Sequence, residues 1–205
     1  MTEPTLHSLK YEWHTFICAY QFLTRIPPPR HFQYNENMMH EAARFYPLVG
    51  ALIGAFAAGI FLLADQFLAV LPAVIISTAA TLYLTGAFHE DGFADVCDGF
   101  GGGWTKPQIL KIMKDSRVGT YALVGLILLF ALKIAALISL LELNQWFALK
   151  SLVLAHVLSR WSSLTIIYTH SYSREDASSK IKPIAKELSF KNLLIGSVWV
   201  LPALV

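Results

Sequence analysis

Long apolar segments limit what this chain can fold into. Four of them are long enough to cross a bilayer as helices of roughly 20 residues. They lie at about 46–71, 72–88, 119–141 and 147–169. A fifth, at 193–205, is too short to cross, and we expect it to be a partial span that the end of the chain cuts off. Because a bilayer contains no water to satisfy backbone polar groups, such segments fold as helices. The sequence therefore predicts an all-α fold, a polytopic transmembrane helical bundle forming a single integral membrane domain over residues 1–205.

The amino-acid composition supports a membrane protein and excludes several other classes. Hydrophobic residues make up 55% of the chain and charged residues only 15%, where an average soluble domain is about a quarter charged. A mean hydropathy of +0.51 leaves too little polar surface for a soluble globule. The two cysteines, Cys18 and Cys97, are too few for a disulfide framework. A formal net charge of +2 argues against nucleic acid as a partner, and the expected partner is the lipid bilayer.

Lysine and arginine are distributed unevenly between the two sides of the predicted spans. Four lie before residue 46, four between residues 89 and 118 and five after residue 169, all on one side. The opposite side has at most Lys150. Because positively charged loops are retained in the cytoplasm, the N-terminus and the two polar loops are predicted to be cytoplasmic.

Residues 1–30 are predicted to contain an amphipathic helix on the membrane surface. Apolar side chains recur there at helical spacing, namely Trp13, Phe16, Ile17, Tyr20 and Leu23. A helix packed against the bundle explains the same pattern equally well. Within the first span, Gly50, Gly54 and Gly59 have the small side chains that helix contacts favour in membranes.

The segment 89–120 is the strongest candidate for a functional site. It contains five of the fourteen acidic residues, and Asp91, Asp95 and Asp98 are spaced four and three apart. If the second span continues as a helix, this spacing places the three carboxylates on one face, about 6 Å apart. Carboxylates so close repel one another unless a cation lies between them, and Mg²⁺ prefers oxygen ligands and bridges to substrate phosphates. We therefore predict that these three aspartates bind Mg²⁺ at the cytoplasmic end of the span; the alternative is a solvated, acidic helix end.

Basic residues follow the acidic ones after a glycine-rich loop. Pro107 is suited to the first turn of a helix, and Lys111, Lys114 and Arg117 then recur every three residues. Lys111 is expected to face anionic lipid. Lys114 and Arg117 flank Asp115 at the membrane edge, and we predict that they bind phosphate.

A metal ion beside phosphate-binding cations indicates phosphoryl transfer at a cytoplasmic acidic active-site loop. The predicted catalytic residues are His89, Asp91, Asp95, Asp98 and Asp115. His89 is a candidate general base for an attacking hydroxyl, although a helix-end histidine or an outer partner of the metal is equally compatible. Arg160 lies within the fourth span, where a charge needs a partner or a cavity. It is predicted to be a counter-ion of the acidic residues or a substrate contact.

Several segments resemble one known family in the order in which that family has them. They are Gln21–Pro27, Phe45–Gly50, Leu84–Gly99 and Ile112–Thr120, together with Lys133, Ser159–Arg160 and Arg174–Glu175. The sequence resembles the cobalamin synthase family, the adenosylcobinamide-GDP ribazoletransferases. The block from Leu84 to Gly99 is long and unusual, which makes the resemblance specific.

The resemblance implies an integral enzyme of the bacterial inner membrane that completes the nucleotide loop of cobalamin. Such an enzyme joins adenosylcobinamide-GDP to α-ribazole, or to its 5′-phosphate, and releases GMP. The implied cofactor is Mg²⁺, with Asp91, Asp95 and Asp98 as metal ligands. Lys114, Asp115 and Arg117 are implied to hold the pyrophosphate. The family also has a late Gly-x-Thr-Gly-Asp stretch that is expected to lie beyond the end of this chain, and a homo-oligomer is left open.

Three other readings fit parts of the pattern less well. A CDP-alcohol phosphotransferase-like membrane enzyme also has aspartates at the end of a span, but Asp95 stands where that pattern has arginine. An aspartate-rich prenyltransferase is a weaker match. A cation transporter would place its acidic ligands nearer the bilayer midplane, whereas these lie at the edge, beside a basic stripe.

Overall fold

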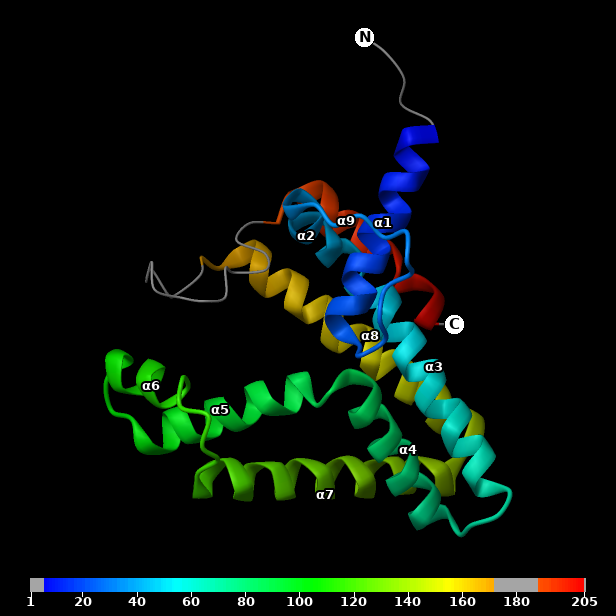
Figure 1. The fold of residues 1–205 in the computed structure, drawn as a ribbon. Coiled ribbons are helices and arrows are strands. Elements are labelled where there is room, and N and C mark those ends of the chain that lie inside the picture. Colours follow the sequence, from blue (N-terminus) through cyan, green and yellow to red (C-terminus); the bar gives the residue numbers. More distant parts are fainter. Residues whose placement is uncertain (1–5, 172–187, 205) are drawn as a thin grey trace. The chain divides into compact units, whose positions relative to one another are not determined.

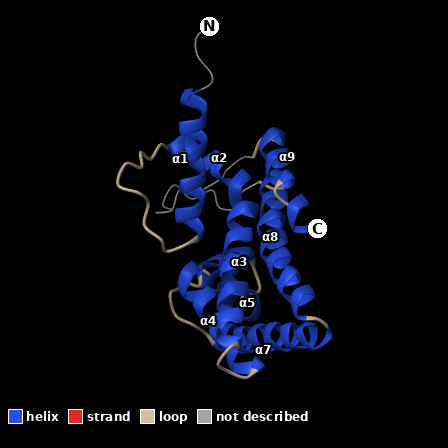
Figure 2. Ribbon diagram, turned by 90° about the vertical axis from the view of Figure 1, so that its right-hand side faces the viewer, coloured by secondary structure: helices blue, strands red, loops and turns tan. Residues whose placement is uncertain are grey.

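The computed structural model describes residues 6–171 and 188–204, and every regular element in these ranges is a helix (Figures 1 and 2). The elements are α1 (Leu6–Leu23), α2 (Glu36–Ala42), η1 (Ala43–Phe45), α3 (Tyr46–Asp65), α4 (Val70–Thr85), α5 (Phe88–Gly102), α6 (Lys106–Ile112), α7 (Thr120–Leu143), α8 (Gln145–Thr169), α9 (Phe190–Val198) and η2 (Leu201–Leu204). The predicted all-α fold is confirmed. Arg174–Glu175, one of the segments that carry the resemblance, lies outside the described residues.

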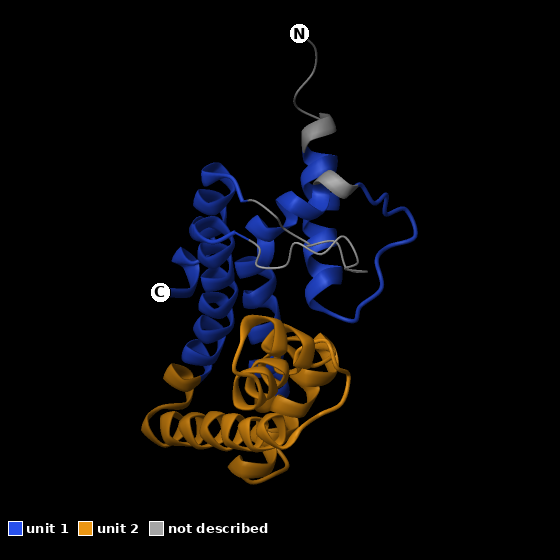
Figure 3. Ribbon diagram, turned by 90° about the vertical axis from the view of Figure 1, so that its left-hand side faces the viewer, with its two compact units in different colours: residues 1–60, 149–205 blue, residues 61–148 orange. Residues whose placement is uncertain are grey.

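The helices form two compact units (Figure 3). Unit 1 comprises residues 1–60 and 149–205, and unit 2 comprises residues 61–148. The whole acidic and basic segment that the sequence marks as functional therefore belongs to unit 2.

In the part of the chain that the structure describes, two helices are long and apolar enough to cross a membrane alone, 38–65 and 120–143. The pair α4 and α5 makes a third candidate if the two helices are taken as one broken span. The exposed surface of α7 is rich in leucine and isoleucine, as a face directed at lipid would be. The chain is thus a membrane helical protein. The helix α8 has the length of a span but contains Lys150, His156 and Arg160, and a crossing by each of the four predicted segments stays a prediction.

A sharp bend separates the second apolar helix from the acidic residues. The helix α4 ends at Gly86, which adopts a left-handed conformation with φ of 69°, and Ala87 follows with φ of 56°. The helices on either side meet at 90°. The second apolar helix therefore does not continue through the acidic residues as one straight helix. Glycine tolerates the left-handed region and stops α4 there, so that the aspartates lie on a separate helix.

Unit 1 contains a buried arginine that connects several of its helices. The Arg44 guanidinium donates to the Glu12 carboxylate on α1 over 2.8 Å and to Glu41 on α2 over 2.9 Å. It also donates to the side-chain oxygen of Asn192 on α9 over 3.1 Å. Because an arginine has five N–H donors, one side chain can join three helices in this way.

The first helix packs on its own unit. Ala19 and Leu23 of α1 are buried, and the helix lies against α2 and η1. This arrangement corresponds to the second interpretation of this segment, a helix packed against the bundle. Its outer face leaves Leu9 and Trp13 70% and 56% exposed, and contact of that face with a membrane surface stays a prediction.

Two of the three glycines on α3 form a close helix contact. A Cβ atom on Gly50 would lie 2.5 Å from the His156 carbonyl oxygen, and one on Gly54 would lie 2.8 Å from the Val153 Cα, both on α8. Gly59, by contrast, faces open space. The predicted contact therefore holds for Gly50 and Gly54 and is wrong for Gly59.

Candidate functional site

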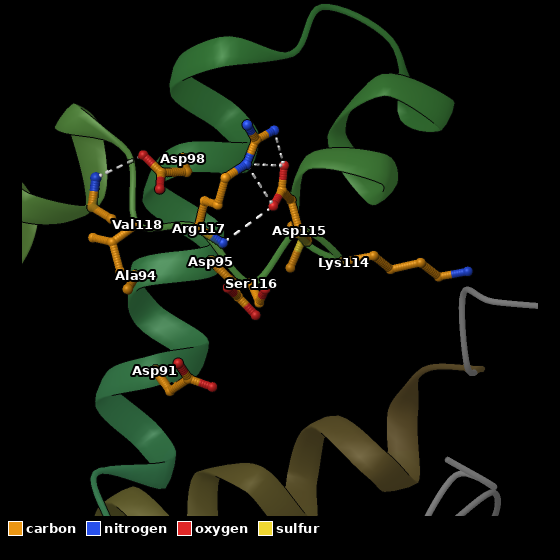
Figure 4. Close-up of a pocket in the computed structure, with 11 residues that line it drawn as sticks. Asp91, Ala94, Asp95, Asp98, Lys114, Asp115, Ser116, Arg117 and Val118 are labelled. Carbon is orange, nitrogen blue, oxygen red and sulfur yellow. Dashed lines mark hydrogen bonds and ion pairs between the residues drawn. The ribbon is translucent and has the colours of Figure 1, made fainter. Parts of the chain in front are cut away.

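One face of α5 lines a cavity of about 210 Å³ in unit 2 (Figure 4). Asp91, Ala94, Asp95 and Asp98 form this wall. Ala94 and Asp95 follow Asp91 by three and four residues, and Asp98 follows them by four and three, which is the spacing that keeps side chains on one side of an α-helix. Ala94 is buried, Asp95 and Asp98 are half-buried, and Asp91 is exposed at the start of the face. The acidity of the cavity thus follows directly from the sequence pattern.

The opposite wall comes from the segment between α6 and α7. Residues 113–118 of this segment line the cavity, among them Lys114, Asp115 and Arg117. The six residues lie beside α5 because α6 and α7 both pack on that helix. The structure therefore brings predicted carboxylates and predicted phosphate-binding cations to a single cavity.

Arg117 and Asp115 form an ion pair at the mouth of the cavity. The Arg117 Nη2 lies 2.6 Å from Asp115 Oδ2, and the Arg117 Nε donates to both carboxylate oxygens over 3.0 Å. These hydrogen bonds lower the pKa of Asp115, and the same contacts raise the pKa of Arg117. In Figure 4 the guanidinium of Arg117 lies over Asp115, whereas the Lys114 side chain extends away from the aspartates.

Asp98 is turned toward the start of α7 rather than toward Asp91 (Figure 4). Its Oδ2 accepts a hydrogen bond from the backbone N–H of Gly119 over 2.6 Å, and its Oδ1 accepts one from Ala122 over 2.9 Å. The first N–H groups of a helix have no partner within the helix. From a neighbouring helix, Asp98 accepts hydrogen bonds from two such N–H groups at the start of α7.

Two other predicted residues do not line this cavity. His89 is exposed on the first turn of α5, with its ring 5.3 Å from that of Phe88. Arg160 is buried on α8 in unit 1, where its Nη1 donates to Ser159 and lies 3.1 Å from His156 Nδ1. The catalytic role of His89 and the substrate-binding role of Arg160 stay predictions.

The comparisons with known proteins identify the family. A family model described as cobalamin-5-phosphate synthase matches residues 15–205. The chain belongs to the cobalamin-5-phosphate synthase family. This family assignment confirms the resemblance seen in the sequence and supports it over the CDP-alcohol phosphotransferase and transporter alternatives.

Curated relatives in the cobalamin-5-phosphate synthase family cover most of the chain. A protein of Leptospira interrogans is 38% identical over 183 residues, which is 89% of this chain and 69% of the relative. One of Shewanella amazonensis is 41% identical over 92% of this chain and 73% of its own length, and one of Leptothrix cholodnii is 42% identical over 94% and 73%. All three are named adenosylcobinamide-GDP ribazoletransferase. No solved structure matches the chain.

The cavity carboxylates suit Mg²⁺ only if water and substrate phosphates complete its coordination. Within residues 6–171 and 188–204, no three His, Cys, Asp or Glu side chains are grouped so that they could hold a metal. Asp91, Asp95 and Asp98 are thus not grouped around one point in this structure, and their joint role as metal ligands stays a prediction. Mg²⁺, however, is commonly bound by one or two carboxylates, water and substrate phosphates. Asp91 and Asp95, on one face of α5, fit that donor set.

The role of Gly119 was missed in the sequence. Glycine directly before an apolar helix supplies no side-chain cap, so the first N–H groups of that helix need an acceptor from elsewhere in the chain. A helix start without Ser, Thr, Asp or Asn at the cap position was the available signal. That signal does not say which residue supplies the acceptor, because Asp98 lies 21 positions away.

Proposed function

We propose that this protein is an adenosylcobinamide-GDP ribazoletransferase of the cobalamin pathway. It would join adenosylcobinamide-GDP to α-ribazole, or to α-ribazole 5′-phosphate, and release GMP. The names of the curated relatives support the substrates. The observation that carries the proposal to this chain is the cavity itself, with aspartates on one wall and Arg117 on the other.

The proposed reaction exchanges one phosphate ester for another. A ribose hydroxyl oxygen of ribazole attacks the phosphorus nearer the cobinamide and forms a P–O bond. The bond from that phosphorus to the oxygen bridging the two phosphorus atoms breaks, and GMP leaves with the bridging oxygen. The hydroxyl proton goes to a general base, for which we propose His89. This residue is exposed on the first turn of α5 and does not line the cavity, so the role requires the attacking hydroxyl to lie at the end of the cavity nearest that turn.

The pyrophosphate is the group that the cavity would hold. We propose Mg²⁺ as the cofactor, held by Asp91 and Asp95; when bound, it supplies positive charge that neutralises phosphate oxygens. Arg117 would donate to the same phosphates from the guanidinium edge that Asp115 does not occupy. Asp115 fixes the guanidinium through its contacts with Nε and Nη2, so the arginine is ordered before substrate arrives.

The distribution of charge gives the proposed orientation. The stretch between α5 and α7 contains Lys106, Lys111, Lys114 and Arg117 and lies between two apolar regions. By the positive-inside rule this segment would lie on the cytoplasmic side of the bacterial inner membrane, as would the N-terminus. Both substrates, which are polar, would then reach the cavity from the cytoplasm.

The test is a product assay on membranes that contain the 205-residue chain. The membranes are incubated with adenosylcobinamide-GDP, α-ribazole and Mg²⁺, and the corrinoid product and GMP are separated by chromatography. Equal amounts of both products are expected, and neither is expected when α-ribazole is omitted. GMP formed without α-ribazole would indicate a hydrolase. Absence of the corrinoid product from correctly inserted protein would overturn the proposal.

A further inference from the structure

Asp98 makes contacts that differ from those of the other two cavity aspartates. Both of its carboxylate oxygens accept backbone N–H groups at the start of α7, from Gly119 over 2.6 Å and from Ala122 over 2.9 Å. A carboxylate at a helix N-terminus is stabilised by these hydrogen bonds and by the helix dipole. Both carboxylate oxygens of Asp98 are therefore already hydrogen-bonded to α7 before any cation is present.

The fit between Asp98 and α7 depends on a missing side chain. A Cβ atom built on Gly119 would lie 2.5 Å from Asp98 Oδ1 and 2.8 Å from the carboxyl carbon. No real Cβ atom approaches a carboxylate so closely, so an alanine at this position would displace Asp98. The contact is thus specific to glycine at position 119 and to the carboxylate of Asp98.

The neighbour of Asp98 makes the matching contact at the other end of the same segment. A Cβ atom on Gly99 would lie 2.7 Å from Met113 Cγ and 3.3 Å from Ile109 Cγ2, so Met113 packs directly on the α5 backbone. Two consecutive residues of α5 therefore hold both ends of residues 113–119. Between these ends lie Lys114, Asp115 and Arg117.

We propose that Asp98 is a positioning residue, which fixes the segment 113–119 against α5, and that it is not a ligand of the metal. This inference rests on the proposed function for the identity of the bound phosphates. It assigns metal binding to Asp91 and Asp95 alone, and it assigns to Asp98 the placement of Arg117. Loss of Asp98 then weakens substrate binding through Arg117 while metal affinity is preserved.

Hydrogen exchange of the free protein tests the contact without substrate or metal. In nanodiscs, Asp98→Asn is expected to raise amide exchange at residues 119–122 by about fivefold to tenfold, the effect of losing a helix cap. Exchange in the middle of α7 is expected to stay unchanged. If exchange at residues 119–122 does not rise, the proposed contact is wrong.

A metal-binding measurement distinguishes a positioning residue from a metal ligand. Mn²⁺ binding is followed by electron paramagnetic resonance in the wild type, Asp98→Asn and Asp95→Asn. Asp95→Asn is expected to weaken binding at least about tenfold, because it removes a proposed metal ligand, and Asp98→Asn less than about twofold, because Asp98 hydrogen-bonds to the α7 backbone. Equal weakening in both variants would make Asp98 a ligand and overturn the proposal.

Kinetics give the third readout. Asp98→Asn is expected to raise the KM for adenosylcobinamide-GDP about tenfold, since the arginine contact to phosphate is weakened, and to leave the half-saturating Mg²⁺ concentration unchanged. A rise in the half-saturating Mg²⁺ concentration with an unchanged KM would contradict the proposal.

Two glycine variants control for loss of packing or folding. Gly119→Ala displaces Asp98 with the carboxylate still present and is expected to reproduce the exchange and KM changes of Asp98→Asn. Gly125→Ala also adds a methyl group between α7 and α5, where a Cβ atom would meet Cys97 Sγ at 2.6 Å, but it does not touch Asp98. If Gly125→Ala gives the same exchange and KM changes as Gly119→Ala, helix spacing and not Asp98 is responsible, and the proposal is wrong.

These experiments can still be interpreted if the proposed function fails. Should the wild type form no corrinoid product, the exchange experiment still decides whether Asp98 caps α7. If Asp98→Asn does not fold, Gly119→Ala decides the same point by itself. Unchanged exchange at residues 119–122 in Gly119→Ala contradicts the proposal in either case.

Discussion

Two nitrogen atoms of the Arg117 guanidinium contact the carboxylate of Asp115, which lies two positions earlier in the chain. The shortest contact is 2.6 Å, between Nη2 and Oδ2. The Arg117 backbone N–H also donates to Asp115 Oδ1 over 3.1 Å. The pair therefore closes a tight turn at the mouth of the acidic cavity. It orders the one side chain in that segment whose shape matches a phosphate.

The pH dependence of substrate binding follows from the direction of the Asp115 pKa. Hydrogen bonds from Arg117 lower this pKa, so the pair is present above the usual carboxyl pKa and is lost only as pH falls through the lowered value. The KM for adenosylcobinamide-GDP should therefore show no ionisation due to Asp115 between pH 5 and pH 8, well above the ordinary value of about 3.9. The measurement is KM against pH for the wild type and Asp115→Asn. An ionisation in this range that disappears in Asp115→Asn would contradict the assignment.

The guanidinium shape of Arg117 should matter more than its charge. Arg117→Lys keeps the charge but cannot hold Asp115 and a phosphate with a planar fork, so KM should rise about tenfold with a smaller change in kcat. The control is Lys111→Ala, because Lys111 is exposed on α6 and does not line the cavity. An unchanged KM in Arg117→Lys, or an equal rise in Lys111→Ala, would show that general surface charge attracts the substrate.

The bend before α5 should be sensitive to the residue at Gly86. Because Gly86 has φ of 69°, Gly86→Ala should destabilise the protein by about 1 kcal/mol and lower its thermal midpoint in detergent. Gly59→Ala is the matched control: Gly59 lies in the interior of α3 with open space around it, and alanine there should stabilise by about 0.5–1 kcal/mol. A lower midpoint for Gly59→Ala, or an unchanged one for Gly86→Ala, would argue against the bend.

Arg44 should contribute to the stability of unit 1 through its three partners. Arg44→Met leaves Glu12, Glu41 and Asn192 without their shared donor, at a cost of about 1–3 kcal/mol. The two glutamates are partly exposed and can be hydrated, which limits the loss. Glu12→Gln keeps a hydrogen-bond acceptor and should cost less. The measurement is the thermal midpoint in detergent, and a larger loss for Glu12→Gln than for Arg44→Met would contradict this picture.

The helical class and the acidic wall of the cavity could be predicted from the sequence. Apolar length alone predicts helices close to α3, α7 and α8, and the spacing of Asp91, Asp95 and Asp98 places them on one face. Both are local properties, since each depends on residues within a few turns of one another.

Other features could not be read from the sequence because their partners are distant or their signals ambiguous. Glycine and alanine are common within membrane helices, so Gly86 and Ala87 did not mark the sharp bend between α4 and α5. The contact between Asp98 and Gly119 joins residues 21 apart, and that between Arg44 and Asn192 joins residues 148 apart. Only the packing of the helices reveals that Asp98 faces α7.

The most direct test of the central claim is turnover by Asp95→Asn. Asp95 lies in the middle of the acidic wall, half-buried on α5, and asparagine preserves its size while removing its charge. Membranes with equal amounts of inserted wild type and Asp95→Asn are supplied with adenosylcobinamide-GDP, α-ribazole and Mg²⁺, and GMP release is measured. The account predicts release by the wild type and at least about a thousandfold loss in the variant, as for removal of a group that stabilises transition-state charge. Turnover retained by Asp95→Asn would contradict the assignment of the acidic wall as the metal and pyrophosphate site.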